Sequence, residues 1–435
     1  MEPTDYGIIG CIALTVMIML GVRIFIAAGI VGFCGLWALR GFDIAVGISG
    51  HIPFSDTTNY APSVLPLFIL IGYLAHSAGI VQGAYRCARA WLGWLPGGLG
   101  IATVFASAGF AAVSGASTAT AAVFSRIAIP ELLRYNYAPG LAAAVVAAGG
   151  TLASLIPPSA IMVVYGIITE TSVGQLLMAG FIPGAISAAM YAAVILVRFK
   201  LNPSLGAPIT GIPWAERFRT LPEILPIVLV IVAVLGGMYT GWSTPTEVGA
   251  LGAFIIFVMA LLRRSLSLRD LMHSLLETAK LTVMIFSIIW GVLIFVRFLA
   301  FAGISTAFQD WITALGVSPY LVLLFVILLY LALGMFMDGI GMLLLTLPVV
   351  FPVMVNLGFD PVWFGIIVVK MVEVGLLTPP VGLNCYVVNG VRPDIPLPKI
   401  FGGVWPFVVA DFICIALFTA FPEIVMFLPN LMLQG

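Results

Sequence analysis

Prolines in this chain recur at a fixed distance of 222 residues. The matching prolines are Pro130 with Pro352, Pro139 with Pro361, Pro157 with Pro379 and Pro158 with Pro380. Two more pairs, Pro96 with Pro319 and Pro183 with Pro406, miss this register by one residue. With 28 prolines in 435 residues, about one position in sixteen is proline, so chance does not explain the register. The chain therefore contains an internal repeat, and each copy interrupts an apolar segment with a Pro-Pro pair.

Composition defines the class of protein. Hydrophobic residues make up 62% of the chain and charged residues 8%, whereas soluble domains carry roughly 25% charged residues. This indicates a polytopic, all-α membrane protein embedded in a lipid bilayer. No basic stripe suggests a nucleic-acid partner. The five cysteines form no CxxC or Cys/His spacing, which disfavours disulfides and a zinc-type metal site.

Ten apolar stretches are long enough to cross a bilayer, which takes about 17–25 residues. They are 5–22, 24–40, 62–82, 139–168, 176–197, 222–240, 246–262, 281–300, 361–389 and 401–428. With the N-terminus on the periplasmic side, 15 of the 18 lysines and arginines fall inside. Only Arg40 and Arg297 fall outside, and Lys370 lies within a span. This distribution agrees with the positive-inside rule. The basic segments 82–98 and 263–280 are typical of interfacial helices.

The crossings also orient the two copies of the repeat. Copy one covers 60–198 and copy two covers 281–428. Copy one makes three crossings, so copy two enters from the opposite side and the repeats are inverted. Residues 1–59 and 199–280 are expected to form scaffold and linking helices, and 429–435 a C-terminal tail.

One apolar stretch in each copy, 98–128 and 320–352, is interrupted by small and polar residues. The interruptions are Ser114 to Thr118 and Met337 to Gly341, with Gly334 just before the second. We interpret each stretch as a re-entrant helical hairpin, because a straight span would reverse the orientation of everything after it. Irregular backbone at membrane depth persists only where protein or a water-filled cavity satisfies it. Both hairpin tips should therefore face a binding site.

The Pro-Pro pairs break the apolar segments 139–168 and 361–389. Proline lacks an N–H and clashes with the preceding turn, which frees backbone carbonyls. Carbonyls and hydroxyls are suitable ligands for Na⁺, and half-helix N-termini attract anions. The alternative is that the prolines are packing kinks and the glycines are close helix contacts.

Four stretches carry a family resemblance. They are SGASTATAAVFSRIAIPELLRYNYAP (114–139), GGTLASLIPPS (149–159), MDGIGMLLLTLPVVFPV (337–353) and VEVGLLTPPVG (372–382). Because of these four stretches, the chain resembles the large membrane subunit of TRAP (tripartite ATP-independent periplasmic) transporters. The resemblance extends over its full length. The resemblance implies a bacterial inner-membrane secondary transporter of the elevator type that imports a carboxylate with Na⁺. It also implies a separate small four-helix membrane subunit and a periplasmic substrate-binding protein, and no organic cofactor.

The same resemblance implies two Na⁺ sites, each where a hairpin tip meets the broken helix of its own copy. The first would use Ser114, Gly115, Ser117, Gly150, Ser154 and Pro157. The second would use Gly334, Asp338, Gly339, Gly375 and Thr378. Most of these ligands would be backbone carbonyls.

Charged residues within an apolar span suggest function. Lys370 and Glu373 lie three residues apart, on one helix face. Lys370 and Glu373 are candidates for substrate binding: Lys370 could contact a substrate carboxylate, and Glu373 could pair with Lys370 or bear on the nearby ion site. The alternative is that the two residues form a mutually neutralising structural pair. Thr118 and Asn384 are further candidates for substrate contact.

Other functions remain to be compared. A stand-alone Na⁺-coupled dicarboxylate carrier would have related hairpins but no binding protein, and a channel would not need matched, occluded sites. An intramembrane enzyme is disfavoured because the sequence has no HExxH, no GxSxG and no intramembrane aspartate pair. The sequence leaves the substrate acid undetermined.

Overall fold

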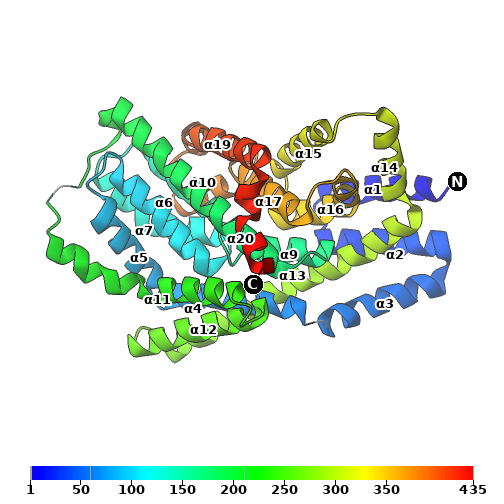
Figure 1. Cartoon of the computed structure of the whole chain (residues 1–435), viewed down its shortest axis with the longest axis horizontal. Helices are drawn as coiled ribbons and strands as arrows, with labels where there is room; N and C mark the ends of the chain where they lie inside the picture. Colours follow the sequence, from blue (N-terminus) through cyan, green and yellow to red (C-terminus); the bar gives the residue numbers. More distant parts are fainter. Residues whose placement is uncertain (1, 59, 210, 435) are drawn as a thin grey trace.

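The computed structural model describes residues 2–58, 60–209 and 211–434, and its regular elements in this part are all helices (Figure 1). The chain starts with α1 (Pro3–Met19), α2 (Ile24–Arg40) and α3 (Phe42–Thr58). A short 3₁₀ turn, η1 (Ala61–Ser63), leads into α4 (Val64–Ser77) and α5 (Ile80–Leu92). The last two helices are bent by 69° relative to each other. Helix α5 overlaps the segment predicted at 82–98, and its interfacial position stays a prediction.

Two series of helices follow the same order. The first contains α6 (Gly98–Ser114), α7 (Ser117–Arg134), α8 (Pro139–Thr151), η2 (Leu152–Ser154), α9 (Ala160–Thr169) and α10 (Val173–Leu201). The second contains α15 (Pro319–Gly334), α16 (Gly339–Asn356), α17 (Pro361–Leu377), α18 (Leu383–Val391) and α19 (Leu397–Ala420). Helices α7 and α16 start and end 222 residues apart (339 − 117 and 356 − 134), as do the starts of α8 and α17 (361 − 139). The register of the prolines is thus also a register of helix boundaries.

The remaining elements link and flank the two series. They are η3 (Pro203–Leu205), α11 (Trp214–Tyr239), α12 (Pro245–Leu262), α13 (Leu268–Ala302), α14 (Ile304–Leu315) and α20 (Pro422–Gln434). Six helices in the described part are long and apolar enough to cross a membrane, and the bent pair α4–α5 gives a seventh candidate. A multi-pass membrane protein is therefore confirmed as the class, while re-entry of the hairpins stays a prediction.

Helix α13 packs along α2 through small residues. A Cβ on Gly32 would lie 2.6 Å from the backbone nitrogen of Phe295, and a Cβ on Gly291 would lie 2.2 Å from the carbonyl oxygen of Phe25. Small residues allow helix backbones to approach this closely inside a membrane. Figure 1 shows α2 at the right with α13 running toward it, α6 and α7 at the left, and α10, α17 and α19 in the middle.

Two expectations need correction. Segments 263–280 and 281–300 are not an interfacial helix followed by a separate span, because Leu268–Ala302 is one helix of 35 residues. Ser267 and Asp270 form its capping box, and the helix continues until Gly303 at φ +69°. Residues 429–434 are helical in α20 rather than a tail. Each error arose because apolar content was used as a proxy for helix boundaries.

The ends of the chain's helices carry recognisable signals. Pro139 and Pro361 occupy the first turns of α8 and α17, where the missing N–H has no cost. The side chain of Asp360 accepts hydrogen bonds from the backbone N–H groups of Val362 and Trp363 at 2.8 and 3.0 Å.

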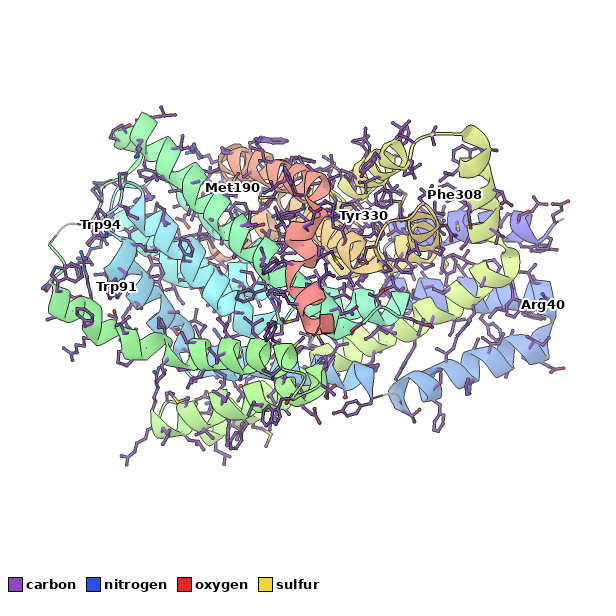
Figure 2. All side chains as sticks on the ribbon, viewed as in Figure 1. Arg40, Trp91, Trp94, Met190, Phe308 and Tyr330 are labelled. Carbon is purple, nitrogen blue, oxygen red and sulfur yellow. The ribbon has the colours of Figure 1, made fainter. Side chains whose placement is uncertain are left out.

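Figure 2 places Trp91 and Trp94 at the opposite end of the molecule from Arg40.

Candidate functional site

The tip of the first hairpin rests on the first Pro-Pro pair. Helix α6 ends at Ser114, Gly115 turns the chain at φ +60°, and α7 begins at Ser117. A Cβ on Gly115 would lie 2.3 Å from the carbonyl oxygen of Pro158. Only glycine fits this position, since it tolerates positive φ and leaves room for the approaching carbonyl. The tip therefore touches the segment between α8 and α9, residues 152–159, which we call the first break.

The first break is buried and rich in oxygen atoms. A Cβ on Gly150, just before it, would lie 2.9 Å from the Cβ of Ala121 on α7. The carbonyl of Ser154 accepts a hydrogen bond from the hydroxyl of Ser159 at 2.5 Å, and Ser159 also caps α9. Ser154 is fully buried, yet its own hydroxyl oxygen has no hydrogen-bond partner. Such an orphaned buried group is uncommon in native structures.

The second hairpin tip meets the second break, residues 378–382, in the same way. The Cα atoms of Gly334 and Gly375 leave no room for side chains, because a Cβ on Gly334 would lie 2.9 Å from the Cα of Gly375. The carbonyl of Met335 accepts a hydrogen bond from the N–H of Val381 at 3.2 Å. Asp338 is exposed, and its carboxylate caps α16 by accepting from the N–H of Gly341 at 3.1 Å.

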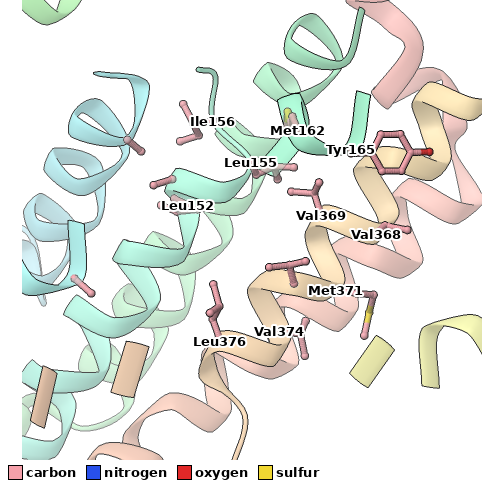
Figure 3. Close-up of a cluster of buried hydrophobic side chains, with 14 of the residues drawn as sticks. Leu152, Leu155, Ile156, Met162, Tyr165, Val368, Val369, Met371, Val374 and Leu376 are labelled. Atoms are coloured by element: carbon pink, nitrogen blue, oxygen red, sulfur yellow. The ribbon is translucent and has the colours of Figure 1, made fainter. Parts of the chain in front are cut away.

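The first break also packs against α17, the helix that ends at the second break. Figure 3 shows Leu152, Leu155 and Ile156 of the first break facing α17, which carries Val374 and Leu376. All five side chains are largely or fully buried. This apolar contact brings the irregular backbone of the two series to one region of the protein interior.

Asn384 connects the second break to the first hairpin. Its amide nitrogen donates hydrogen bonds to the Ser117 hydroxyl at 2.9 Å and to the Ala147 carbonyl at 3.1 Å. A carbonyl oxygen only accepts hydrogen bonds, so the atom of Asn384 that contacts the Ala147 carbonyl must be the amide nitrogen. The amide oxygen of Asn384 then lies buried without a partner. It is a second orphaned oxygen beside the first hairpin tip.

Lys370 and Glu373 are fully buried and form an ion pair at 2.6 Å. Lys370 also pairs with Asp411 of α19 at 2.7 Å and donates to the Ser187 hydroxyl of α10 at 2.9 Å. The pairing predicted from the sequence is present. In this conformation three acceptors surround the ammonium group of Lys370.

Two members of this group were missed in the sequence. Asp411 accepts hydrogen bonds from the Tyr191 hydroxyl at 2.7 and 2.8 Å, and Tyr191 lies 3.3 Å from the Thr151 hydroxyl beside the first break. Asp411 lies inside the apolar segment 401–428, so its charge alone was the available signal. Tyr191 gave no signal, since aromatic residues are ordinary in such spans.

The structure gathers most of the predicted site residues at the two breaks. Ser114 bonds to Thr120 within the first tip at 3.1 Å, and the Thr378 hydroxyl donates to the Val374 carbonyl at 2.6 Å. Gly339 packs on Val372 of α17. Thr118 is exposed, and no contact brings it into the group. Among the described residues, no set of three or more His, Cys, Asp or Glu side chains could hold a metal ion.

Comparison with known proteins gives a consistent result. Residues 11–424 match the family described as the tripartite ATP-independent periplasmic transporter, DctM component. The C4-dicarboxylate TRAP transporter large permease protein DctM of Pseudomonas aeruginosa is 36% identical over 378 residues, covering 87% of this chain and 88% of that protein. The sialic acid TRAP transporter large permease protein SiaM of Vibrio cholerae is 32% identical over 376 residues, covering 86% and 87%.

A more distant relative and a solved structure extend the comparison. The 2,3-diketo-L-gulonate TRAP transporter large permease protein YiaN of Escherichia coli is 27% identical over 416 residues, covering 94% of this chain and 95% of that protein. The crystal structure of the Alcanivorax borkumensis YdaH transporter superposes with a TM-score of 0.62 at 13% identity. It covers 98% of this chain and all of the YdaH chain, which supports the overall helical arrangement.

Proposed function

The chain belongs to the DctM family of large TRAP transporter permease subunits, and we propose that it imports an organic acid across the bacterial inner membrane by Na⁺ symport. The observation that carries this proposal is the seating of each hairpin tip on a break, through Gly115 at the Pro158 carbonyl and through the Met335 carbonyl at the N–H of Val381. Matched irregular segments at the centre of a transporter are typical of substrate and ion sites.

The residues at the first break fit a Na⁺ ion. Ser154 and Asn384 each present a buried neutral oxygen without a partner, and hard cations bind oxygen ligands, amide carbonyls among them. Gly115 and Gly150 permit the close backbone approach that carbonyl ligands require. At the second break, Thr378, Gly375 and Gly334 are the corresponding candidates, with Asp338 as the cap of α16. A bound Na⁺ would supply the coupling to the ion gradient.

Helix N-termini suit an anionic substrate. Both α7 and α16 begin at hairpin tips, at Ser117 and Gly339, and each is 18 residues long. The first N–H groups of a helix have no partner within the helix and the helix dipole favours negative charge there; at α16 the Asp338 carboxylate already accepts from one of them, the N–H of Gly341. The relatives are named for C4-dicarboxylates, sialic acid and 2,3-diketo-L-gulonate, which are all organic acids. We therefore place a carboxylate between the two tips.

We assign Lys370 a structural role in the conformation described, because its ammonium group already has three acceptors. Helices α6–α10 and α15–α19 would form the moving unit of an elevator, and α2 and α13 part of the scaffold. Tight packing of α2 on α13 supports a rigid scaffold. A separate small membrane subunit and a periplasmic binding protein would complete the transporter.

Uptake into proteoliposomes tests this function. The chain would be reconstituted with its small subunit, and radiolabelled organic acids would be supplied with or without an inward Na⁺ gradient and the candidate binding protein. We expect uptake only when both are present. Uptake with Na⁺ alone would favour the stand-alone carrier, and uptake that ignores Na⁺ would reject symport.

A further inference from the structure

The buried charges of this chain do not cancel. Lys370, Glu373 and Asp411, which we call the charge cluster, are each fully buried and are joined by ion pairs of 2.6 and 2.7 Å. With all three ionised, the charge cluster carries one positive and two negative charges. The neighbouring groups that we name are neutral. Ser187, Tyr191 and Thr151 are connected to the charge cluster by hydrogen bonds, and Cys414 lies about one helical turn after Asp411 on α19.

One oxygen of the charge cluster is unused. Glu373 bonds to Lys370 through Oε2, whereas its Oε1 is buried and has no hydrogen-bond partner. Both oxygens of Asp411 accept from Tyr191, and Oδ1 also accepts from Lys370. An uncompensated buried charge is costly, because the interior solvates it far less well than water does. The surplus negative charge is therefore offset either by a proton on one carboxylate or by a cation, and the position of the charge cluster favours a cation.

The charge cluster is linked to residues next to both breaks. Asp411 is connected through Tyr191 to Thr151, which directly precedes the first break. Glu373 lies on α17, two residues before Gly375, and this helix ends at the second break. These connecting residues are all buried.

Most of the candidate Na⁺ ligands carry no charge. They are carbonyl and hydroxyl oxygens at Ser154, Gly375 and Thr378 and their neighbours, while the one carboxylate among them, Asp338, is exposed and caps a helix. A cation held by neutral ligands in the interior needs a counter-charge nearby, since charges interact strongly in a medium of low dielectric constant.

From these observations we infer that the charge cluster is the counter-charge of the coupling ion: its surplus negative charge stabilises Na⁺ at the breaks. Glu373 and Asp411 then act through the electric field and through Lys370, which holds them in place, and they are positioning residues for ion binding. This inference rests on the proposed Na⁺ symport.

Na⁺ binding to the purified protein provides the test, without any transport measurement. The melting temperature of the detergent-solubilised protein would be followed against Na⁺ concentration, with choline chloride keeping the ionic strength constant. Glu373→Gln removes the surplus charge, and we expect its Na⁺ midpoint to rise about tenfold or more, which corresponds to about 1.4 kcal/mol. Asp411→Asn removes the same charge from another helix and should act in the same direction.

Three further variants separate charge from structure. Tyr191→Phe removes hydrogen bonds to Asp411 but no charge, so its Na⁺ midpoint should stay near that of the wild type even if its melting temperature falls. Lys370→Met combined with Glu373→Gln restores a surplus of one negative charge and should recover most of the lost affinity. Glu223→Gln, at an ion pair with Arg86 outside the charge cluster, should leave the midpoint unchanged.

Two results would overturn the inference in different ways. In the first, the wild type responds to Na⁺, and the Glu373→Gln and Asp411→Asn variants fold and have the same Na⁺ midpoint as the wild type. The surplus charge is then cancelled by something else, such as a proton, and only this inference fails. If the wild type shows no specific response to Na⁺ in melting or uptake, the proposed symport fails with it.

Discussion

Gly334 and Gly375 face each other so closely that a Cβ on Gly375 would lie 2.7 Å from the Cα of Gly334. These residues join the second hairpin to α17, just before the second break. Contacts this short cannot be relieved by rotating a side chain, because the nearest atoms belong to the backbone. Seating of the second hairpin thus depends on the absence of two side chains.

We predict that Gly375→Ala abolishes most uptake. The added methyl group must push α15 away from α17, and overpacking of this kind costs about 1–3 kcal/mol. The measurement is Na⁺-driven uptake per milligram of reconstituted protein, together with the melting temperature. Gly402→Ala is the matched control, since nothing lies within 4 Å of a Cβ at that helical position. Equal uptake by the two variants would contradict the importance of the close contact.

A second prediction concerns the first hairpin. Gly115→Ala should reduce uptake strongly, because alanine at φ +60° costs about 1–2 kcal/mol and its Cβ would meet the Pro158 carbonyl. The control is Gly109→Ala on α6, where the nearest atom to the new Cβ would be 3.9 Å away. If Gly115→Ala transports like the control, the tip does not have to rest on the first break.

The third prediction contrasts two Lys–Glu pairs of the same spacing. Lys370→Met leaves two carboxylates buried without their partner, and breaking a buried pair in this way costs about 3–5 kcal/mol. We expect poor expression and a lower melting temperature, rather than a folded protein with weak substrate affinity. Lys280→Met removes the partner of Glu277 at an exposed ion pair, and it should change the melting temperature little. A stable Lys370→Met protein with a raised KM would instead restore the substrate-contact interpretation.

Asn384 supplies the fourth prediction. Asn384→Leu removes both hydrogen bonds to the first hairpin region and the free amide oxygen, at a cost of about 1–3 kcal/mol. The Na⁺ concentration for half-maximal uptake should rise, because Asn384 is a candidate oxygen ligand. Asn389→Leu on the same helix loses one bond to the Ile395 carbonyl, away from the break, and is the control. The prediction is wrong if both variants need the same Na⁺ concentration as the wild type.

The sequence predicted the breaks well because their signals are local. Proline and glycine impose backbone conformations wherever they occur, so Pro157-Pro158 and Gly115 marked irregular segments without any knowledge of packing. The 222-residue register added a comparison between two parts of the chain, and α7 and α16 have boundaries in that register.

Pairing across the fold could not be predicted in the same way. Asp411 is 41 residues from Lys370, and Tyr191 is 220 residues from Asp411. Nothing in the local sequence says which of the apolar helices meet, since every face of a buried helix is apolar. The charge of Asp411 marked it as unusual, but only the packing of α10, α17 and α19 identifies its partners.

The last prediction concerns orientation, which the structure alone does not define. The distribution of basic residues places the loop after α10 inside and the loop between α14 and α15 outside. In a protein without its native cysteines, Ser204→Cys in the loop after α10 and Asp310→Cys in the second half of α14, which leads into the other loop, would report on these two regions, and both positions are exposed. A membrane-impermeant maleimide added to intact spheroplasts should label Cys at position 310 and leave position 204 unlabelled until the membrane is permeabilised. The reverse pattern would place the N-terminus inside. If the maleimide labels both positions in intact spheroplasts, the two positions lie on the same side of the membrane. The number of crossings assigned between α10 and α14 would then be wrong by an odd number. That result would also remove the argument for re-entrant hairpins, because the hairpin interpretation depends on the same count.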